Sequence, residues 1–133
     1  MHLNIRRQRQ MFIRASGELL ERDFDAAASA FETYLKDFPQ GQFRAHAHFW
    51  LGEVYSNQKS PQLDKARKQF QTVVDDYPNH SRAPTSLYKL ASLQAKAGNT
   101  SEAEVSLHKL IKQFPDASEA EMAKAMLKQL NGG

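Results

Sequence analysis

The stretch Phe49-Trp50-Leu51-Gly52-Glu53-Val54-Tyr55 decides the fold of this chain. It holds the only tryptophan and a Leu-Gly pair that is followed three residues later by a tyrosine. Its leucine lies twelve residues after Pro39, and the same distance separates Pro78 from Leu90 and Pro115 from Leu127. Each of these prolines follows an aromatic residue. The chain therefore contains an internal repeat, and the repeat predicts a binding scaffold without naming its ligand.

A second signature recurs inside each repeat: an alanine, apolar residues four and seven positions later, and a proline at position twelve. The three sets are Ala27, Phe31, Tyr34 and Pro39; Ala66, Phe70, Val73 and Pro78; and Ala103, Leu107, Leu110 and Pro115. Offsets of four and seven place side chains on one face of a helix. The proline ends that helix because it cannot continue the hydrogen-bond ladder.

Another amphipathic stretch precedes each of these helices, at residues 11–20, 45–57 and 84–97. Breaks at Arg22-Asp23, residues 59–62 and Gly98-Asn99 separate the two helices of a pair. Ser118 and Glu121 have the spacing of a capping box and predict a seventh helix over residues 118–130. No stretch alternates polar and apolar residues as a strand does. We therefore expect an all-α fold of three antiparallel helix pairs and a C-terminal capping helix.

We expect one domain over residues 11–130, with repeats at 11–39, 44–78 and 82–115, after a basic N-terminal segment at residues 1–10. Hydrophobic residues make up 41% and charged residues 25% of the 133, which excludes a disordered chain. No cysteine is present, so disulfides, zinc-thiolate sites and cysteine nucleophiles are excluded. We expect no membrane insertion, because no run of about eighteen apolar residues occurs. The N-terminus has no signal-peptide pattern, so an exported protein would be a mature fragment lacking its signal peptide.

The pattern Leu51-Gly52 with Tyr55, followed by Ala66, Phe70 and Pro78, resembles the tetratricopeptide repeat (TPR). The resemblance implies a right-handed superhelix of helix pairs. Successive prolines are 39 and 37 residues apart, whereas the usual period is about 34 residues. The additional length includes the connectors that follow each proline.

Three segments carry a narrower resemblance: FPQGQFRAHAHFWLGEVY from residue 38, FQTVVDDYPNHSRAPTSLYKLA from residue 70 and FPDASEAEMAKAML from residue 114. They are similar to the C-terminal repeat domain of the CpoB (YbgF) family of the Tol-Pal system. That family implies a non-enzymatic periplasmic adaptor that binds TolA and coordinates peptidoglycan synthesis with cell division. Long connectors also occur in the outer-membrane assembly lipoprotein BamD. A TPR scaffold of another envelope-assembly complex, or of a cytoplasmic complex, is therefore the alternative.

In a repeat of this type the first helix of each pair lines a concave groove, which we expect to bind the partner. Phe12, Phe49 and Tyr88 share one register and predict an aromatic ladder in the groove, unless their rings pack between neighbouring first helices. The expected groove residues are Phe12, Ser16, His46, Phe49, Trp50, Glu53, Thr85, Tyr88, Lys89 and Ser92. Aromatic and serine side chains at these positions argue against a carboxylate clamp, and they favour a helical or extended segment with apolar anchors.

Other classes of function have weaker support. His46 and His48 are two residues apart on a helix and point in different directions, so they do not form a metal pair. The chain has no glycine-rich phosphate loop and no Gly-x-Ser-x-Gly turn, so we expect neither an enzyme nor a cofactor. The net charge of +3 is concentrated in Arg6, Arg7, Arg9 and Arg14. This basic edge leaves nucleic-acid binding as a third and less favoured interpretation.

Overall fold

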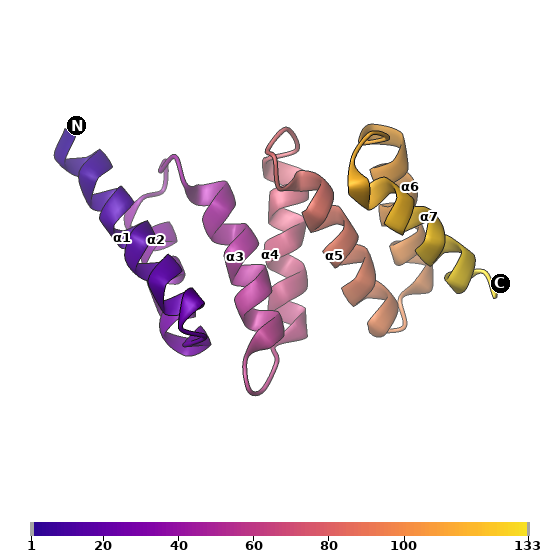
Figure 1. Ribbon diagram of the computed structural model, residues 1–133, viewed down its shortest axis with the longest axis horizontal. Helices are drawn as coiled ribbons and strands as arrows, with labels where there is room; N and C mark the ends of the chain where they lie inside the picture. The colour runs from indigo at the N-terminus through magenta and orange to yellow at the C-terminus, as the bar shows by residue number, and fades with distance from the viewer. Residues whose placement is uncertain (1, 133) are drawn as a thin grey trace. The chain divides into compact units, whose positions relative to one another are not determined.

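A computed structural model describes the backbone of residues 2–132 and the side chains of residues 4–132. Over this range the protein is all-α, with seven helices and no strand (Figure 1). The helices are α1 (His2–Leu20), α2 (Phe24–Asp37), α3 (Arg44–Asn57), α4 (Leu63–Asp76), α5 (Ala83–Lys96), α6 (Thr100–Gln113) and α7 (Ser118–Leu130). The expected three pairs and terminal helix are confirmed.

The chain forms two compact units, residues 1–69 and 70–133, and the boundary between them lies within α4. In the first unit α2 packs against both α1 and α3. In the second unit α6 packs against α5 and α7, and α7 also contacts α5. The expectation of a single domain over residues 11–130 concerns how the two units combine, and it stays a prediction.

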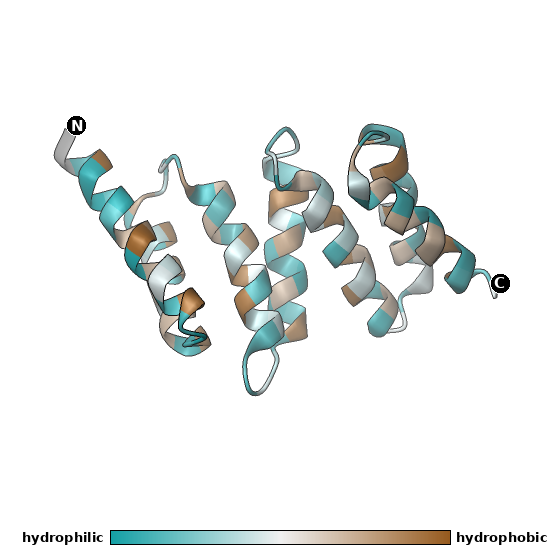
Figure 2. Ribbon diagram, in the orientation of Figure 1, coloured by the Kyte–Doolittle hydropathy of each residue, from teal (hydrophilic) through white to brown (hydrophobic). Residues whose placement is uncertain are grey.

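The repeated stripe forms the core of each unit, as its spacing predicts. Ala27, Phe31 and Tyr34 are buried on α2, and Ala103, Leu107 and Leu110 are buried on α6. Polar and apolar residues alternate around each helix, so teal and brown patches follow one another along the ribbons (Figure 2). Burying one apolar stripe of each helix provides the main driving force for this fold.

Helix α1 begins nine residues before the expected start at Met11, because part of the basic segment is held against the first unit. The Gln8 side chain is buried, and its Oε1 accepts a hydrogen bond of 2.9 Å from the Tyr34 hydroxyl. The same hydroxyl accepts the backbone N–H of Phe43 at 2.8 Å. Gly41 has no room for a side chain, since a Cβ there would meet the Tyr34 hydroxyl and Gln8 Oε1. These contacts fasten the connector between α2 and α3 to α1.

Helix α3 is buried along two stripes, which sets it apart from a helix at the edge of a repeat array. One stripe contains Ala47, Leu51 and Val54, and the other contains Ala45, Phe49 and Gly52. The Tyr55 hydroxyl donates a hydrogen bond to Glu32 of α2, and burial followed by this bond raises the pKa of Tyr55. His48 Nδ1 lies 2.7 Å from Gln69 Oε1 of α4. Contacts to both α2 and α4 explain why this helix is apolar on more than one side.

Helix α7 has the expected bounds but a different N-terminus from the one predicted. Its N-cap residue is Ala117, and no side chain caps the helix. The Ser118 hydroxyl instead donates to Glu119 Oε1 at 3.1 Å, so the Ser118–Glu121 capping box is not formed. The prediction of a helix was right while its capping mechanism was wrong. Glu119 and Glu121 in the first turn still favour the helix through its dipole.

Candidate partner-binding site

The ten expected groove residues lie on the first helices of the three pairs. Phe12 and Ser16 belong to α1, and His46, Phe49, Trp50 and Glu53 belong to α3, so these six lie in the first unit. Thr85, Tyr88, Lys89 and Ser92 belong to α5, in the second unit. Their use as a binding site stays a prediction. Within each unit, however, the contacts of each residue separate side chains that serve packing from those that reach the surface.

Phe49 does not reach a groove in this structure, because only 2% of its surface is exposed. It lies on the second buried stripe of α3 with Ala45 and Gly52. A helical wheel with one core-facing stripe places Phe49 outside the core, but α3 has a neighbouring helix on each side. The expectation that Phe49 contacts a partner is therefore corrected to a packing role.

The Phe12 ring also serves the interior of its unit. It lies edge-on to Phe31 with a centroid separation of 5.6 Å and stacks on Phe43 at 5.2 Å. Its edge contacts extend to Tyr34 at 6.3 Å and to His46 of α3 at 5.9 Å. Aromatic rings at these separations stabilise one another. These contacts give the half-buried Phe12 ring a packing role against α2, the connector and α3, and its use in a groove stays a prediction.

Several of the polar groove residues have partners inside their own unit. The Ser16 hydroxyl donates to the Phe12 carbonyl at 2.8 Å, one turn earlier in α1. The Thr85 hydroxyl donates to Glu119 Oε2 of α7 at 2.5 Å, and this hydrogen bond is the main reason that the pKa of Glu119 is lowered. Thr85 therefore holds the terminal helix. Tyr88, Lys89 and Ser92 are half-buried on the same helix.

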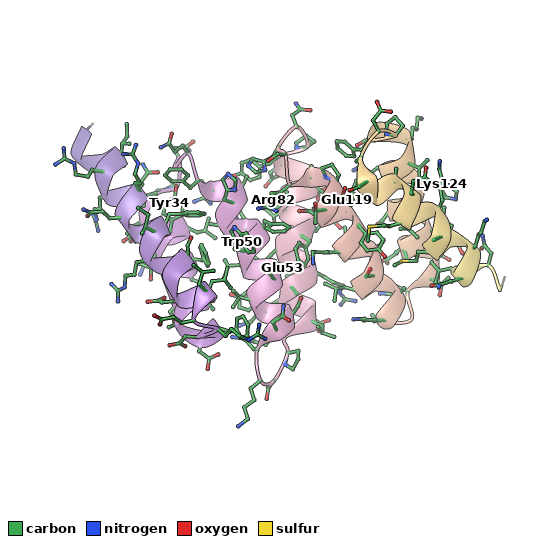
Figure 3. All side chains as sticks on the ribbon, in the orientation of Figure 1. Tyr34, Trp50, Glu53, Arg82, Glu119 and Lys124 are labelled. Carbon is green, nitrogen blue, oxygen red and sulfur yellow. The ribbon has the colours of Figure 1, made fainter. Side chains whose placement is uncertain are left out.

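Figure 3 labels Trp50 and Glu53 on α3. Both side chains are half-buried, and both border a cavity of about 230 Å³. The Trp50 ring lies edge-on to Phe49 at 5.0 Å. The other lining residues are Leu19, Arg22, Phe24 and Asn57, which come from the end of α1, the turn after it, the start of α2 and the end of α3. Two of the expected groove positions, Trp50 and Glu53, therefore border an open cavity within the first unit.

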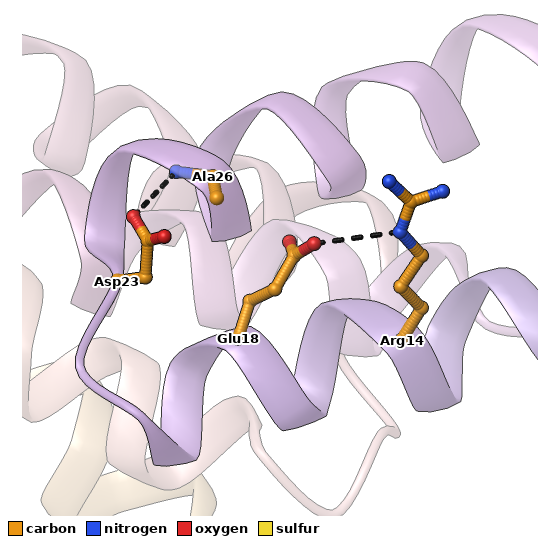
Figure 4. A network of polar contacts seen from close by, with 4 residues as sticks. All are labelled: Arg14, Glu18, Asp23 and Ala26. Atoms are coloured by element: carbon orange, nitrogen blue, oxygen red, sulfur yellow. Dashed lines mark hydrogen bonds and ion pairs between the residues drawn. The ribbon is translucent and has the colours of Figure 1, made fainter.

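The turn between α1 and α2 shapes one wall of this cavity. Arg22 has a φ of 60°, and it is the one residue other than glycine with a positive φ in the range 2–132. The Asp23 N–H bonds to the Glu18 carbonyl at 2.9 Å, and the Arg22 N–H bonds to the Leu19 carbonyl at 3.0 Å. Figure 4 shows Asp23 capping α2 through the Ala26 N–H, and Glu18 with its ion-pair partner Arg14. The Arg22 guanidinium lies over the Phe24 ring, 5.1 Å from its centroid.

The sequence did not indicate Leu19, Arg22, Phe24 or Asn57 as site residues, because their positions mark only the ends of helices. One signal was available: Arg22 aligns with Gly98 in the third repeat, where a left-handed turn is expected. An arginine at such a position brings a long cationic side chain to a place where glycine is the usual residue.

The part of the chain that the structure describes supports neither a metal site nor a membrane-spanning helix. Residues 4–132 contain no group of three or more His, Asp or Glu side chains placed to hold a metal ion. No helix in the described range combines the length and the apolar character that crossing a membrane requires.

Paired helices with a recurring Ala/+4/+7/+12 pattern place this chain in the class of TPR-like helical repeat proteins. More particularly, the chain belongs to the YfiO family, described as outer membrane lipoprotein, whose model matches residues 6–132. A segment of 34 residues is 44% identical to the protein named cell division coordinator CpoB from Pseudomonas putida, including strain KT2440. That segment is 26% of this chain and 13% of the length of those relatives.

Proposed function

We propose that this protein is a non-enzymatic adaptor that binds a segment of another cell-envelope protein on the surface of its first helices. The observation that carries the proposal is the cavity beside Trp50 and Glu53, where an aromatic and a charged side chain of a first helix remain accessible. Half-exposed aromatic residues beside polar groups are the usual anchors of protein interfaces. The TPR-like family supports the same class of function.

The first candidate for the partner is TolA, with a periplasmic role in coordinating cell division and a connection to the peptidoglycan synthesis machinery. The similarity of a 34-residue segment to CpoB supports this candidate. Since the matched segment covers a small part of those relatives, the partner and the periplasmic location are proposals for this chain.

The second candidate is a scaffold of an outer-membrane assembly complex, of the kind that BamD represents. The description of the matching family as outer membrane lipoprotein supports it, and that match covers most of the chain. Neither comparison favours a cytoplasmic scaffold. Nucleic-acid binding is also weakened, because Arg7 lies 3.5 Å from Asp37 and stacks over Phe38, while Arg14 pairs with Glu18.

Calorimetric titration with the purified periplasmic part of TolA tests the first candidate. We expect wild type to bind and Trp50→Ala to bind at least about tenfold more weakly, as for an interface anchor. Met122→Ala on α7 changes an exposed apolar residue of the second unit and is the matched control. Absence of binding by wild type would reject TolA, and equal binding by Trp50→Ala would reject the site.

A photo-crosslinking amino acid at position 50, used in cells, separates the two candidates. Products that contain Tol proteins support the first, and products that contain outer-membrane assembly proteins support the second. The same probe at the exposed position 122 controls for proximity alone.

A further inference from the structure

Helix α1 carries half of the large apolar side chains that are exposed in residues 4–132. Of the six, Ile5, Ile13 and Leu20 belong to this helix, and their exposed fractions are 38%, 63% and 85%. Ile13 and Leu20 lie eight and fifteen residues after Ile5. With about 3.6 residues per turn, these separations place the three side chains within about 80° of one another around the helix. The three residues therefore form an apolar stripe on the surface of the first unit.

The packing of the first unit uses a different side of α1. Gln8 and Ala15 are buried on that side, and the Phe12 ring contacts α2, the connector and α3. The cavity beside Trp50 is lined by Leu19 of this helix and by no residue of the stripe. The stripe is thus left over after the contacts within the unit are made.

The charges of α1 and the turn after it are separated by sign. Residues 4–14 contain four arginines and no acidic residue, whereas residues 15–25 contain four acidic residues and one arginine. Arg6, Arg9 and Glu21 are exposed, and none of them has an ion-pair partner within the described part of the chain. A parallel copy of this helix would bring like charges together, whereas an antiparallel copy brings arginines beside acidic residues.

The spacing of the stripe is nearly the same in both directions. Arg9 and Ser16 lie between its members, so successive positions are three or four residues apart, as along the seam of a coiled coil. A second α1 that runs antiparallel and crosses at Ile13 places Ile5 beside Leu20. Arg9 then lies beside Ser16, whose small side chain leaves room for the apolar stem of the arginine. A two-fold axis requires a surface that is complementary to itself, and this stripe meets that requirement.

We infer that α1 is a self-association surface, on which a second copy of this chain packs its own α1 antiparallel with the two-fold axis at Ile13. The two apolar stripes bury each other, and Arg6 of each copy lies near Glu21 of the other. One face of a single helix is smaller than the roughly 800 Å² per partner of stable complexes, so the dimer is weak, with a Kd on the order of 10⁻⁴ M. This inference goes beyond the proposed adaptor function and does not depend on it.

Sedimentation equilibrium of the full chain between about 10 µM and 1 mM tests the self-association. We expect a monomer–dimer equilibrium for wild type and at least about tenfold weaker association for Ile13→Asp, which places two like charges at the axis. Val105→Asp changes an apolar residue of α6 that is 68% exposed, and this matched control should associate as wild type does. Both changed positions are exposed, so both variants should keep the circular dichroism of wild type.

Two results of this experiment would overturn the inference. One is a wild type that stays monomeric at the highest concentration. The other is an Ile13→Asp variant that associates as strongly as Val105→Asp.

An exchange of charges tests the antiparallel direction. Arg6→Glu alone and Glu21→Arg alone each place like charges opposite one another and should weaken the dimer about threefold at low salt, since exposed ion pairs contribute little. The double variant restores opposite charges with their signs reversed, and it should recover the Kd of wild type. A double variant that associates more weakly than either single variant would contradict the proposed pairing.

Disulfide crosslinking locates the axis, because the chain has no cysteine of its own. Ile13→Cys should form a disulfide-linked dimer under mild oxidation, since the two copies meet at this position. Leu20→Cys should not link to itself, but it should link to Ile5→Cys when the two variants are mixed. Val105→Cys gives the rate of linking by random collision. Self-linking of Leu20→Cys above that rate would indicate parallel helices and would rule out the arrangement inferred for α1.

Discussion

The helix pairs α1–α2 and α5–α6 follow the same repeat but are held together by different chemistry. At the repeat position where α2 carries Tyr34, α6 carries Leu110, and both are buried. At the turn the first pair has Arg22 above Phe24, whereas the third pair has Gly98 followed by Thr100. At these two positions the α5–α6 pair carries only an apolar side chain and a glycine. The first pair adds two groups that its backbone does not require. The Tyr34 hydroxyl fastens the connector between α2 and α3, and the Arg22 side chain lines the candidate pocket beside Trp50 and Glu53.

Removing the buried Tyr34 hydroxyl of the α1–α2 pair should have the largest effect on stability. Tyr34→Phe leaves Gln8 Oε1 and the Phe43 N–H without their partner, and unsatisfied buried groups cost about 1–3 kcal/mol. We expect the free energy of unfolding in urea to fall by about 2 kcal/mol. Tyr88→Phe, on the half-buried Tyr88 of α5, should change it by less than about 0.5 kcal/mol. Similar losses in the two variants would contradict the role given to Tyr34.

Giving the third pair the turn residue of the first pair should have a smaller effect. Gly98→Arg places a side chain at a φ of 85°, and we expect a loss of about 1 kcal/mol in urea unfolding. A Cβ at Gly98 meets no atom within 4 Å, so the loss reflects backbone conformation and not a clash.

Gly17→Ala is the control for that change. A Cβ at Gly17 also meets no atom within 4 Å, but Gly17 lies inside α1. The substitution should therefore stabilise the protein by about 0.5–1 kcal/mol. A stabilising Gly98→Arg would show that the left-handed turn does not distinguish the two pairs.

The reciprocal change, Arg22→Gly, should leave stability nearly constant. It relieves roughly 1–2 kcal/mol of backbone strain. It also loses about 0.5–1 kcal/mol of ring stacking and adds freedom to the unfolded chain. We expect a net change within about 0.5 kcal/mol in urea unfolding. A loss above about 2 kcal/mol would mean that Arg22 is chiefly a structural residue.

The smallest expected effect is a change in the pH dependence of stability under acidic conditions. Hydrogen bonding from Thr85 lowers the pKa of Glu119 below its ordinary value of 4.5. A lowered pKa in the folded state stabilises the protein above the unfolded pKa, and this contribution is lost as the pH falls through the folded pKa. Thr85→Val should raise the midpoint of Glu119 in an NMR titration toward 4.5 and reduce the loss of stability on acidification. Ser92→Ala, on the same helix, should leave the midpoint unchanged.

Local periodicity was sufficient to predict the helices, since Ala27, Phe31 and Tyr34 repeat along one face and are buried there. It was insufficient for the start of α1, because the burial of Gln8 depends on Tyr34, 26 residues away. Phe49 was predicted to lie in the groove because the sequence pattern of a single helix does not show how many other helices pack against it. The pocket escaped prediction because Arg22 acts through a backbone conformation and a ring contact with Phe24, and neither follows a helical period.

The hydrogen bond from the Phe43 N–H to the Tyr34 hydroxyl also allows the undocking of α1 to be measured. The Phe43 amide lies at the end of a connector, where amides usually exchange with solvent quickly. Its hydrogen bond ends on a hydroxyl that is itself held by Gln8 of α1. Deuterium uptake at this single amide should therefore be gated by the undocking of α1, and its protection factor would measure the free energy of that opening. Exchange at Phe43, a connector residue, would thus report the opening of α1, a helix that is distant from it in the sequence.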